Sequence, residues 1–124
     1  MMYDLWKDLY GIVEKRKIEH EEGSYTAYLF DMGLDKVLKK LGEETTETII
    51  AAKNLKACVD SGADGETAQK AREDLDGEVG DMLYHLVVML DMLGIEPDEI
   101  EDLLSERMKK TRNLKDTRQT SIDS

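Results

Sequence analysis

The sequence predicts an all-α protein, a bundle of about five helices, from three observations. Apolar residues recur at steps of three and four along most of the chain, and they never alternate with polar residues over the length of a strand. The 124 residues contain a single proline, Pro97, so long uninterrupted helices are possible. The length suits one domain, which we expect to span residues 1–112, followed by a polar and disordered tail at residues 113–124.

Five segments carry the helical pattern, at about residues 3–18, 24–30, 34–60, 67–93 and 97–112. Ser24 can cap the second helix, which ends near Gly33. Gly94 ends the fourth helix, and Pro97 occupies the first turn of the fifth, where its missing N–H costs nothing. A short loop joins the two long helices, so we expect them to lie antiparallel at the centre of the bundle.

Composition excludes several classes of function. The net charge is −11, from 28 acidic and 17 basic residues, and such a surface repels a nucleic acid strand. One cysteine, Cys58, leaves no disulfide within the chain and no paired-cysteine metal site. The first residues lack the features of a signal peptide, and the longest apolar run, Leu86 to Leu90, is too short to span a bilayer. We therefore expect a cytoplasmic protein without a nucleic acid or membrane partner.

The second half of the fourth helix, residues 82–93, is apolar nearly all the way round, with Asp91 the main exception. A helix of this kind has neighbours on every side. We expect a second subunit to cover part of it, in a homodimer whose third and fourth helices form a four-helix-bundle core. The alternative is a central helix that is fully enclosed within a monomer.

Acidic residues on the two long helices form the candidate site. The third helix carries Glu44 and Glu47, and the fourth carries a series spaced by four, three and four, within a roughly 60° arc of one face, consisting of Asp74, Glu78, Asp81 and His85. Antiparallel packing would let Glu44 and Glu47 face Glu78 and Asp81. Grouped carboxylates are destabilising unless protons, lysines or a hard cation compensate them. Four oxygen donors suit Mg²⁺, whereas His85 is better interpreted as a hydrogen-bonded core histidine.

These residues resemble a known signature. Glu44-x-x-Glu47 followed by Glu78-x-x-Asp81 is similar to the motif of the all-α nucleoside-triphosphate pyrophosphatases, the MazG-like superfamily. Within this superfamily, five surrounding segments resemble those of the phosphoribosyl-ATP pyrophosphohydrolases. These segments are Gly23-Ser24-Tyr25-Thr26, Gly33-Leu34-Asp35-Lys36, Lys40-Leu41-Gly42-Glu43, Ala51-Ala52-Lys53-Asn54 and Asp81-x-Leu83-Tyr84-His85-Leu86. Together they cover roughly residues 5 to 110, and as a set they are far more specific than a lone pair of glutamates.

The resemblance implies Mg²⁺-dependent hydrolysis of phosphoribosyl-ATP to phosphoribosyl-AMP and pyrophosphate, the second step of histidine biosynthesis. It implies a metal bound by Glu44, Glu47, Glu78 and Asp81, with a general base from the Glu44 and Glu47 pair. The candidates for contacting the substrate are Lys40, Lys53, Asn54 and Arg107, although solvated surface positions are an equally good interpretation of the lysines. Cys58 lies outside every motif, which disfavours a covalent intermediate.

Two other functions remain open at this stage. A house-cleaning nucleoside-triphosphate pyrophosphatase would use the same metal site on free or damaged nucleotides, and a comparison of turnover on phosphoribosyl-ATP and dUTP would distinguish it. A non-catalytic helical interaction module would have a merely acidic surface. Titration with Mg²⁺ separates that possibility, because such a module has no reason to bind the ion at a defined site.

Overall fold

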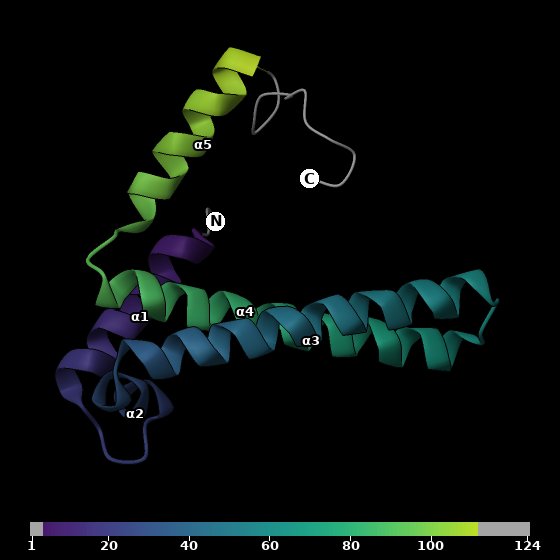
Figure 1. The fold of residues 1–124 in the computed structure, drawn as a ribbon, viewed down its shortest axis with the longest axis horizontal. Helices are drawn as coiled ribbons and strands as arrows, with labels where there is room; N and C mark the ends of the chain where they lie inside the picture. The colour runs from purple at the N-terminus through teal and green to yellow at the C-terminus, as the bar shows by residue number, and fades with distance from the viewer. Residues whose placement is uncertain (1–3, 112–124) are drawn as a thin grey trace.

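The computed structural model describes residues 4–111, and these form five helices with no strand among them (Figure 1). The helices are α1 (Leu5–Glu19), α2 (Tyr25–Met32), α3 (Leu34–Asp60), α4 (Gly65–Met92) and α5 (Pro97–Thr111). The predicted all-α class and the five helical segments are confirmed. The expected domain end at residue 112 and the tail at residues 113–124 lie outside the described residues.

The two longest helices, α3 with 27 residues and α4 with 28, form an antiparallel hairpin that reaches well beyond the other elements (Figure 1). The turn between them depends on two residues. Gly62 has a φ of +70°, a conformation that glycine adopts without steric cost. Asp64 caps α4, because its Oδ1 accepts a hydrogen bond of 2.8 Å from the backbone N–H of Thr67. The hairpin predicted for the centre of the fold is therefore confirmed.

A second sharp turn sets α2 against the start of α3. Ser24 caps α2 by accepting a hydrogen bond of 3.2 Å from the backbone N–H of Ala27, as the sequence predicts. Gly33 ends α2 at φ +92° and ψ −177°, and α3 begins at the next residue. Because residues with a side chain rarely adopt this backbone conformation, Gly33 fixes the angle between α2 and the hairpin.

The hydrophobic core lies at one end of the hairpin, where α1 and α2 pack against α3 and α4. Its fully buried members are Val13, Leu29, Val37, Val87 and Val88. Trp6, Tyr10, Phe30 and Tyr84 are among the partly buried residues around them. The chain's own helices thus enclose much of the apolar stretch of α4 that was expected to need a second subunit. Val87 and Val88 are enclosed within the chain, whereas Leu83 and Leu86 are partly exposed and Leu93 is 52% exposed, so the dimer expected from this stretch stays a prediction.

Other apolar residues are exposed on α1, α2, α3 and α5, and three of them lie in the second half of α3. Ile49, Ile50 and Val59 of α3 are 60%, 54% and 58% exposed. Ile49 and Val59 lie within about 80° of each other around α3, whereas Ile50 and Val59 lie on opposite sides of it. Among residues 4–111, no helix combines the length and apolar character needed to cross a membrane.

The one acidic residue of the apolar stretch, Asp91, has a basic partner on α1. The Lys17 ammonium donates hydrogen bonds to Asp91 Oδ1 at 3.0 Å and to Glu14 Oε1 at 3.1 Å. Burial, followed by the hydrogen bond with Glu14, raises the pKa of Asp91 to about 6, whereas Lys17 acts to lower it. This ion pair ties α1 to the end of α4 inside the core region.

Replacing Lys17 with methionine should destabilise the fold by about 2 kcal/mol at pH 7, because it leaves a buried carboxylate without its cation. Without Lys17 the pKa of Asp91 rises further, so the loss should shrink as the pH falls to 5 and Asp91 takes up a proton. Urea denaturation measures both effects. Lys15→Met is the matched control, because Lys15 pairs with Glu19 at 4.0 Å on an exposed surface and should contribute within about 0.5 kcal/mol. Equal losses in the two variants would contradict the assignment.

Candidate metal centre

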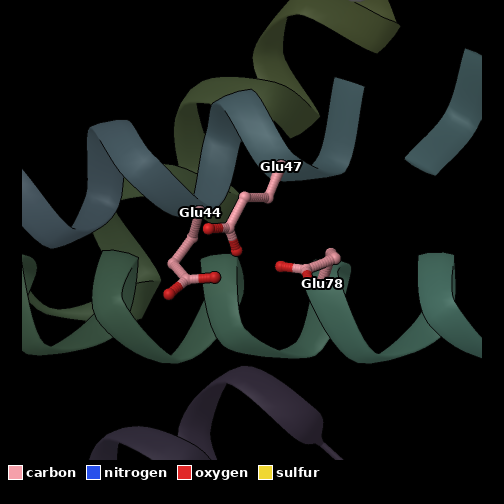
Figure 2. Close-up of side chains that lie close together, drawn as sticks. All are labelled: Glu44, Glu47 and Glu78. Atoms are coloured by element: carbon pink, nitrogen blue, oxygen red, sulfur yellow. The ribbon is translucent and has the colours of Figure 1, made fainter. Parts of the chain in front are cut away.

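Three glutamates from the two helices of the hairpin point toward one another (Figure 2). Glu44 and Glu47 stand on α3, and Glu78 stands on α4. One carboxylate oxygen from each lies within 4.8 Å of the others. The i, i+3 spacing puts Glu44 and Glu47 on one side of α3, and antiparallel packing brings Glu78 opposite them. The structure thus assembles three of the four predicted metal ligands.

Part of this cluster is removed from water. Glu44 is only 9% exposed, and its Oε2 is buried without a hydrogen-bond partner, as is Oε2 of Glu78. Glu47 is exposed. A buried carboxylate oxygen without a partner costs free energy, and most proteins avoid it. Two such oxygens on glutamates of one cluster therefore require an explanation.

The proximity of the carboxyl groups changes the acidity of Glu78. Hydrogen bonding with the Glu47 carboxyl group contributes most, followed by burial and by Glu44, and together they raise the pKa of Glu78 to about 7. The physical cause is that two carboxylates at this distance repel each other when both are ionised, and a shared proton relieves the repulsion. At neutral pH the cluster is therefore poised to exchange a proton for a cation.

Lysines do not provide that cation. Three lysines of α3 and α4 pair with other carboxylates, namely Lys40 with Glu43 at 3.6 Å, Lys56 with Asp60 at 2.9 Å and Lys70 with Asp74 at 3.2 Å, and within residues 4–111 no ion pair joins a lysine to Glu44, Glu47 or Glu78. Hard carboxylate oxygens with two unpartnered, buried atoms fit Mg²⁺, which prefers oxygen ligands and keeps several waters. Protons, lysines or a hard cation could compensate the grouped carboxylates. Of these three, a proton on Glu78 and a hard cation remain.

The fourth predicted ligand, Asp81, lies beside the cluster rather than within it. It lines an open cavity of about 430 Å³ together with Glu47 and Glu78. Asn54, a predicted substrate contact, lines the same cavity. The remaining wall residues are Ile50, Ala51, Glu73, Asp74 and Gly77. The cavity is thus an acidic recess between α3 and α4 with room for more than a metal ion.

Of the other predicted substrate contacts, only Lys40 lies near the carboxylates. Lys40 is half-buried one turn before Glu44 on α3, and the hydroxyl of Tyr25, followed by Glu43, raises the pKa of its ammonium group. Lys53 is exposed on α3 and is not part of the cavity wall. Arg107 is exposed on α5, which points away from the hairpin (Figure 1). Within one chain the structure brings Lys40 and Asn54 to the carboxylates, but not Lys53 and Arg107.

A hydrogen-bonded group next to the site was not identified from the sequence. His85 is 4% exposed, which confirms its interpretation as a core histidine, and its Nδ1 lies 2.7 Å from the backbone oxygen of Asp81. Its Nε2 lies 2.8 Å from the hydroxyl of Tyr25. The hydroxyls of Thr26 and Tyr84 are hydrogen-bonded alongside. The segments Gly23-Ser24-Tyr25-Thr26 and Asp81-x-Leu83-Tyr84-His85-Leu86 contain all of these residues, but nothing in the sequence shows that the two segments meet.

The fold and the site define an all-α protein with an acidic recess between two antiparallel helices. Residues 6–108 match the family described as phosphoribosyl-ATP pyrophosphohydrolase, and the chain belongs to that family. Proteins named phosphoribosyl-ATP pyrophosphatase are similar over nearly their whole length. The one from Clostridium novyi is 40% identical, covering 93% of this chain and 91% of its own. The one from Limosilactobacillus fermentum is 44% identical, covering 93% of each, and the one from Streptococcus thermophilus is 42% identical, covering 91% and 94%.

The proton on Glu78 predicts a pH dependence of stability in the absence of divalent cations. The folded-state pKa of about 7 lies above the ordinary value of 4.5, so the stabilising contribution is complete below 4.5 and is lost as the pH rises through 7. In chelator, the melting temperature of the protein should therefore fall between pH 5 and pH 8, and Glu78→Gln should reduce that fall. Saturating Mg²⁺ should reduce it in the unmodified protein too. An unchanged slope in Glu78→Gln would contradict the shared-proton interpretation.

Proposed function

We propose that this chain hydrolyses phosphoribosyl-ATP to phosphoribosyl-AMP and pyrophosphate, the second step of histidine biosynthesis, with Mg²⁺ as its cofactor. One observation carries the proposal. In a chain of the phosphoribosyl-ATP pyrophosphohydrolase family, three facing glutamates converge beside an open cavity, and two of their oxygens are buried without partners. Family membership supports the substrate, and the carboxylates support the metal.

The acidic residues of the hairpin would have two roles, binding the metal ion and accepting a proton. Glu44, Glu47 and Glu78 would hold the ion, and Asp81 would complete its surroundings from the cavity wall. When bound, Mg²⁺ neutralises the charge of phosphate oxygens and makes a bound water more acidic. Glu44 is buried whereas Glu47 is exposed and lines the cavity, so Glu47 is the better placed of the pair to take a proton from the attacking water.

Substrate contacts follow from the same geometry. Lys40 lies one helical turn from Glu44 and would contact phosphate, and Asn54 would donate or accept hydrogen bonds within the cavity. Lys53 and Arg107 can contribute only from outside the cavity wall.

We further propose a cytoplasmic homodimer whose α3–α4 hairpins pair in a four-helix bundle. Ile49, Ile50 and Val59 are more than half exposed on a helix that projects beyond the core. Pairing two hairpins would bury Ile49 and Val59 in a shared core, at about 1.5–3 kcal/mol for each one that becomes fully buried, whereas Ile50 lines the cavity. The support for the dimer thus comes from the projecting part of α3.

Two other functions are weaker. A house-cleaning nucleoside-triphosphate pyrophosphatase would share the carboxylates, but the family match favours phosphoribosyl-ATP over free nucleotides. A non-catalytic interaction module does not account for buried, unpartnered oxygens at the point where the glutamates converge. Product analysis after incubation with phosphoribosyl-ATP, compared with dUTP, tests the substrate directly.

Glu47→Gln should lower the turnover of phosphoribosyl-ATP by about 10²–10⁴-fold, because it removes a negative charge and the proposed general base while keeping the shape of the side chain. Circular dichroism and the melting temperature should change little, since Glu47 is exposed. Glu66→Gln, in the exposed first turn of α4, is the control and should retain full activity. Excess chelator should abolish turnover of the unmodified protein, and full activity in chelator would rule out the metal mechanism.

Ile49→Asp should dissociate the dimer without unfolding the chain, because a charge in a shared apolar core costs about 2 kcal/mol or more. Ile18→Asp is the control, as Ile18 is 75% exposed on α1 and lies outside the hairpin. Sedimentation equilibrium measures both variants. A monomeric unmodified protein at micromolar concentration, or a dimer that survives Ile49→Asp, would count against this interface.

A further inference from the structure

One wall residue of the cavity beside the candidate metal centre has no side chain. Helix α4 contributes five residues to the wall of this cavity of about 430 Å³, namely Gly77 and the four acidic residues Glu73, Asp74, Glu78 and Asp81. Glu73 lies one helical turn before Gly77 and Asp81 one turn after it, so these three share one stripe of the helix. The middle of the α4 wall is therefore bare backbone with carboxyl groups around it.

Neither packing nor backbone conformation requires a glycine at position 77. The residue lies in the middle of α4, where glycine is a weaker helix former than any residue except proline. A Cβ atom on Gly77 would meet no heavy atom of the described chain within 4 Å, so the fold has room for a side chain there. Gly77 is exposed, and it lines the cavity. The open space next to it therefore belongs to the cavity and not to the core.

The chemistry of the two walls limits what can occupy this space. Ionised carboxylates only accept hydrogen bonds, so the α4 wall repels phosphate and accepts hydrogen bonds from hydroxyl groups. On the facing α3 wall, Ile50 and Ala51 offer apolar contact and Asn54 offers an amide. A ribose fits both walls, because its hydroxyl groups can donate to carboxylates while its carbon atoms lie against apolar side chains and bare backbone.

We propose that Gly77 is a specificity-determining residue, which leaves the middle of the α4 wall free for a ribose of phosphoribosyl-ATP to lie against the helix backbone. This inference rests on the proposed function. It divides the substrate between two parts of one recess, with the phosphates at the metal centre of Glu44, Glu47 and Glu78 and a ribose at Gly77. A side chain at position 77 would obstruct the ribose, although the fold itself can accommodate that side chain.

Gly77→Ala should move activity and stability in opposite directions. The added methyl group should lower kcat/KM for phosphoribosyl-ATP by about tenfold or more, mainly by raising KM, because it obstructs a substrate that must fit against the backbone. Alanine should also raise the melting temperature by about 2–4 °C, since it favours the helix and restricts the unfolded chain. Steady-state kinetics and calorimetry measure the two effects. A merely structural role for Gly77 would not lower activity while stability rises.

Gly80→Ala is the matched control. Gly80 is also an exposed residue within α4, and a Cβ atom there also meets no heavy atom of the described chain within 4 Å, but Gly80 is not part of the cavity wall. It lies about 60° round the helix from Gly77, on the side away from Glu78. Gly80→Ala should therefore raise the melting temperature as much as Gly77→Ala does, and it should leave kcat/KM within about twofold of the unmodified protein.

Product inhibition distinguishes a ribose from a phosphate at Gly77, because phosphoribosyl-AMP contains riboses and pyrophosphate contains none. Gly77→Ala should raise the inhibition constant of phosphoribosyl-AMP by about tenfold or more and that of pyrophosphate by no more than about twofold. Equal increases for the two products would mean that phosphate lies at Gly77, which would overturn the inference.

The outcomes separate this inference from the proposed function. No turnover of phosphoribosyl-ATP by the unmodified protein would overturn the proposed function itself. Turnover with an unchanged kcat/KM in Gly77→Ala would overturn the role of Gly77 and leave the proposed function standing. An equal loss of activity in Gly80→Ala would assign the effect to the stiffness of α4, and that result would overturn the role of Gly77 as well.

Discussion

The candidate site is built on one unfavourable contact, the convergence of Glu44, Glu47 and Glu78 between two antiparallel helices. Nothing in helix propensity or packing favours three carboxylates within 4.8 Å of one another, and like charges at this range oppose folding. The hairpin tolerates the cluster because its stability comes from elsewhere, from the apolar core that α1 and α2 build at one end. An energetically unfavourable group of side chains that is held in place by an otherwise stable fold is typical of a functional site.

The chain buries carboxylates in two different ways, and the contrast separates structure from function. Asp91 also has one buried oxygen without a hydrogen-bond partner, Oδ2, but Lys17 reaches its Oδ1 from α1 at 3.0 Å and so supplies a positive charge from within the chain. Glu44 and Glu78 have buried oxygens for which residues 4–111 supply no partner. The first arrangement fastens two helices together. The second leaves charge to be neutralised by something that the polypeptide does not contain, which is the requirement for a ligand site.

Much of this architecture could be predicted from the sequence, because it follows from local rules. Helical periodicity, the cap at Ser24 and the antiparallel packing of helices joined by a short loop are all properties of neighbouring residues, whereas the cap at Asp64 was not predicted, and α4 begins two residues before its expected start at residue 67. The facing of Glu44 and Glu47 toward Glu78 follows from spacing alone. Asp81 shares that face, yet its carboxylate stays outside the group of converging oxygens, and its side chain is one methylene shorter than that of glutamate. Helical periodicity predicts which face of a helix a residue occupies, but not whether its side chain is long enough to reach the other carboxylates.

The contacts that sequence reasoning missed join distant parts of the chain. Lys17 and Asp91 are 74 residues apart, and Tyr25 and His85 are 60 apart, so each pairing exists only after α1 and α2 have packed on α4. Such pairings have no signature of period or spacing. Local periodicity therefore predicts which residues share a face of the hairpin, whereas the polar pairings that join α1 and α2 to α4 are set by tertiary packing.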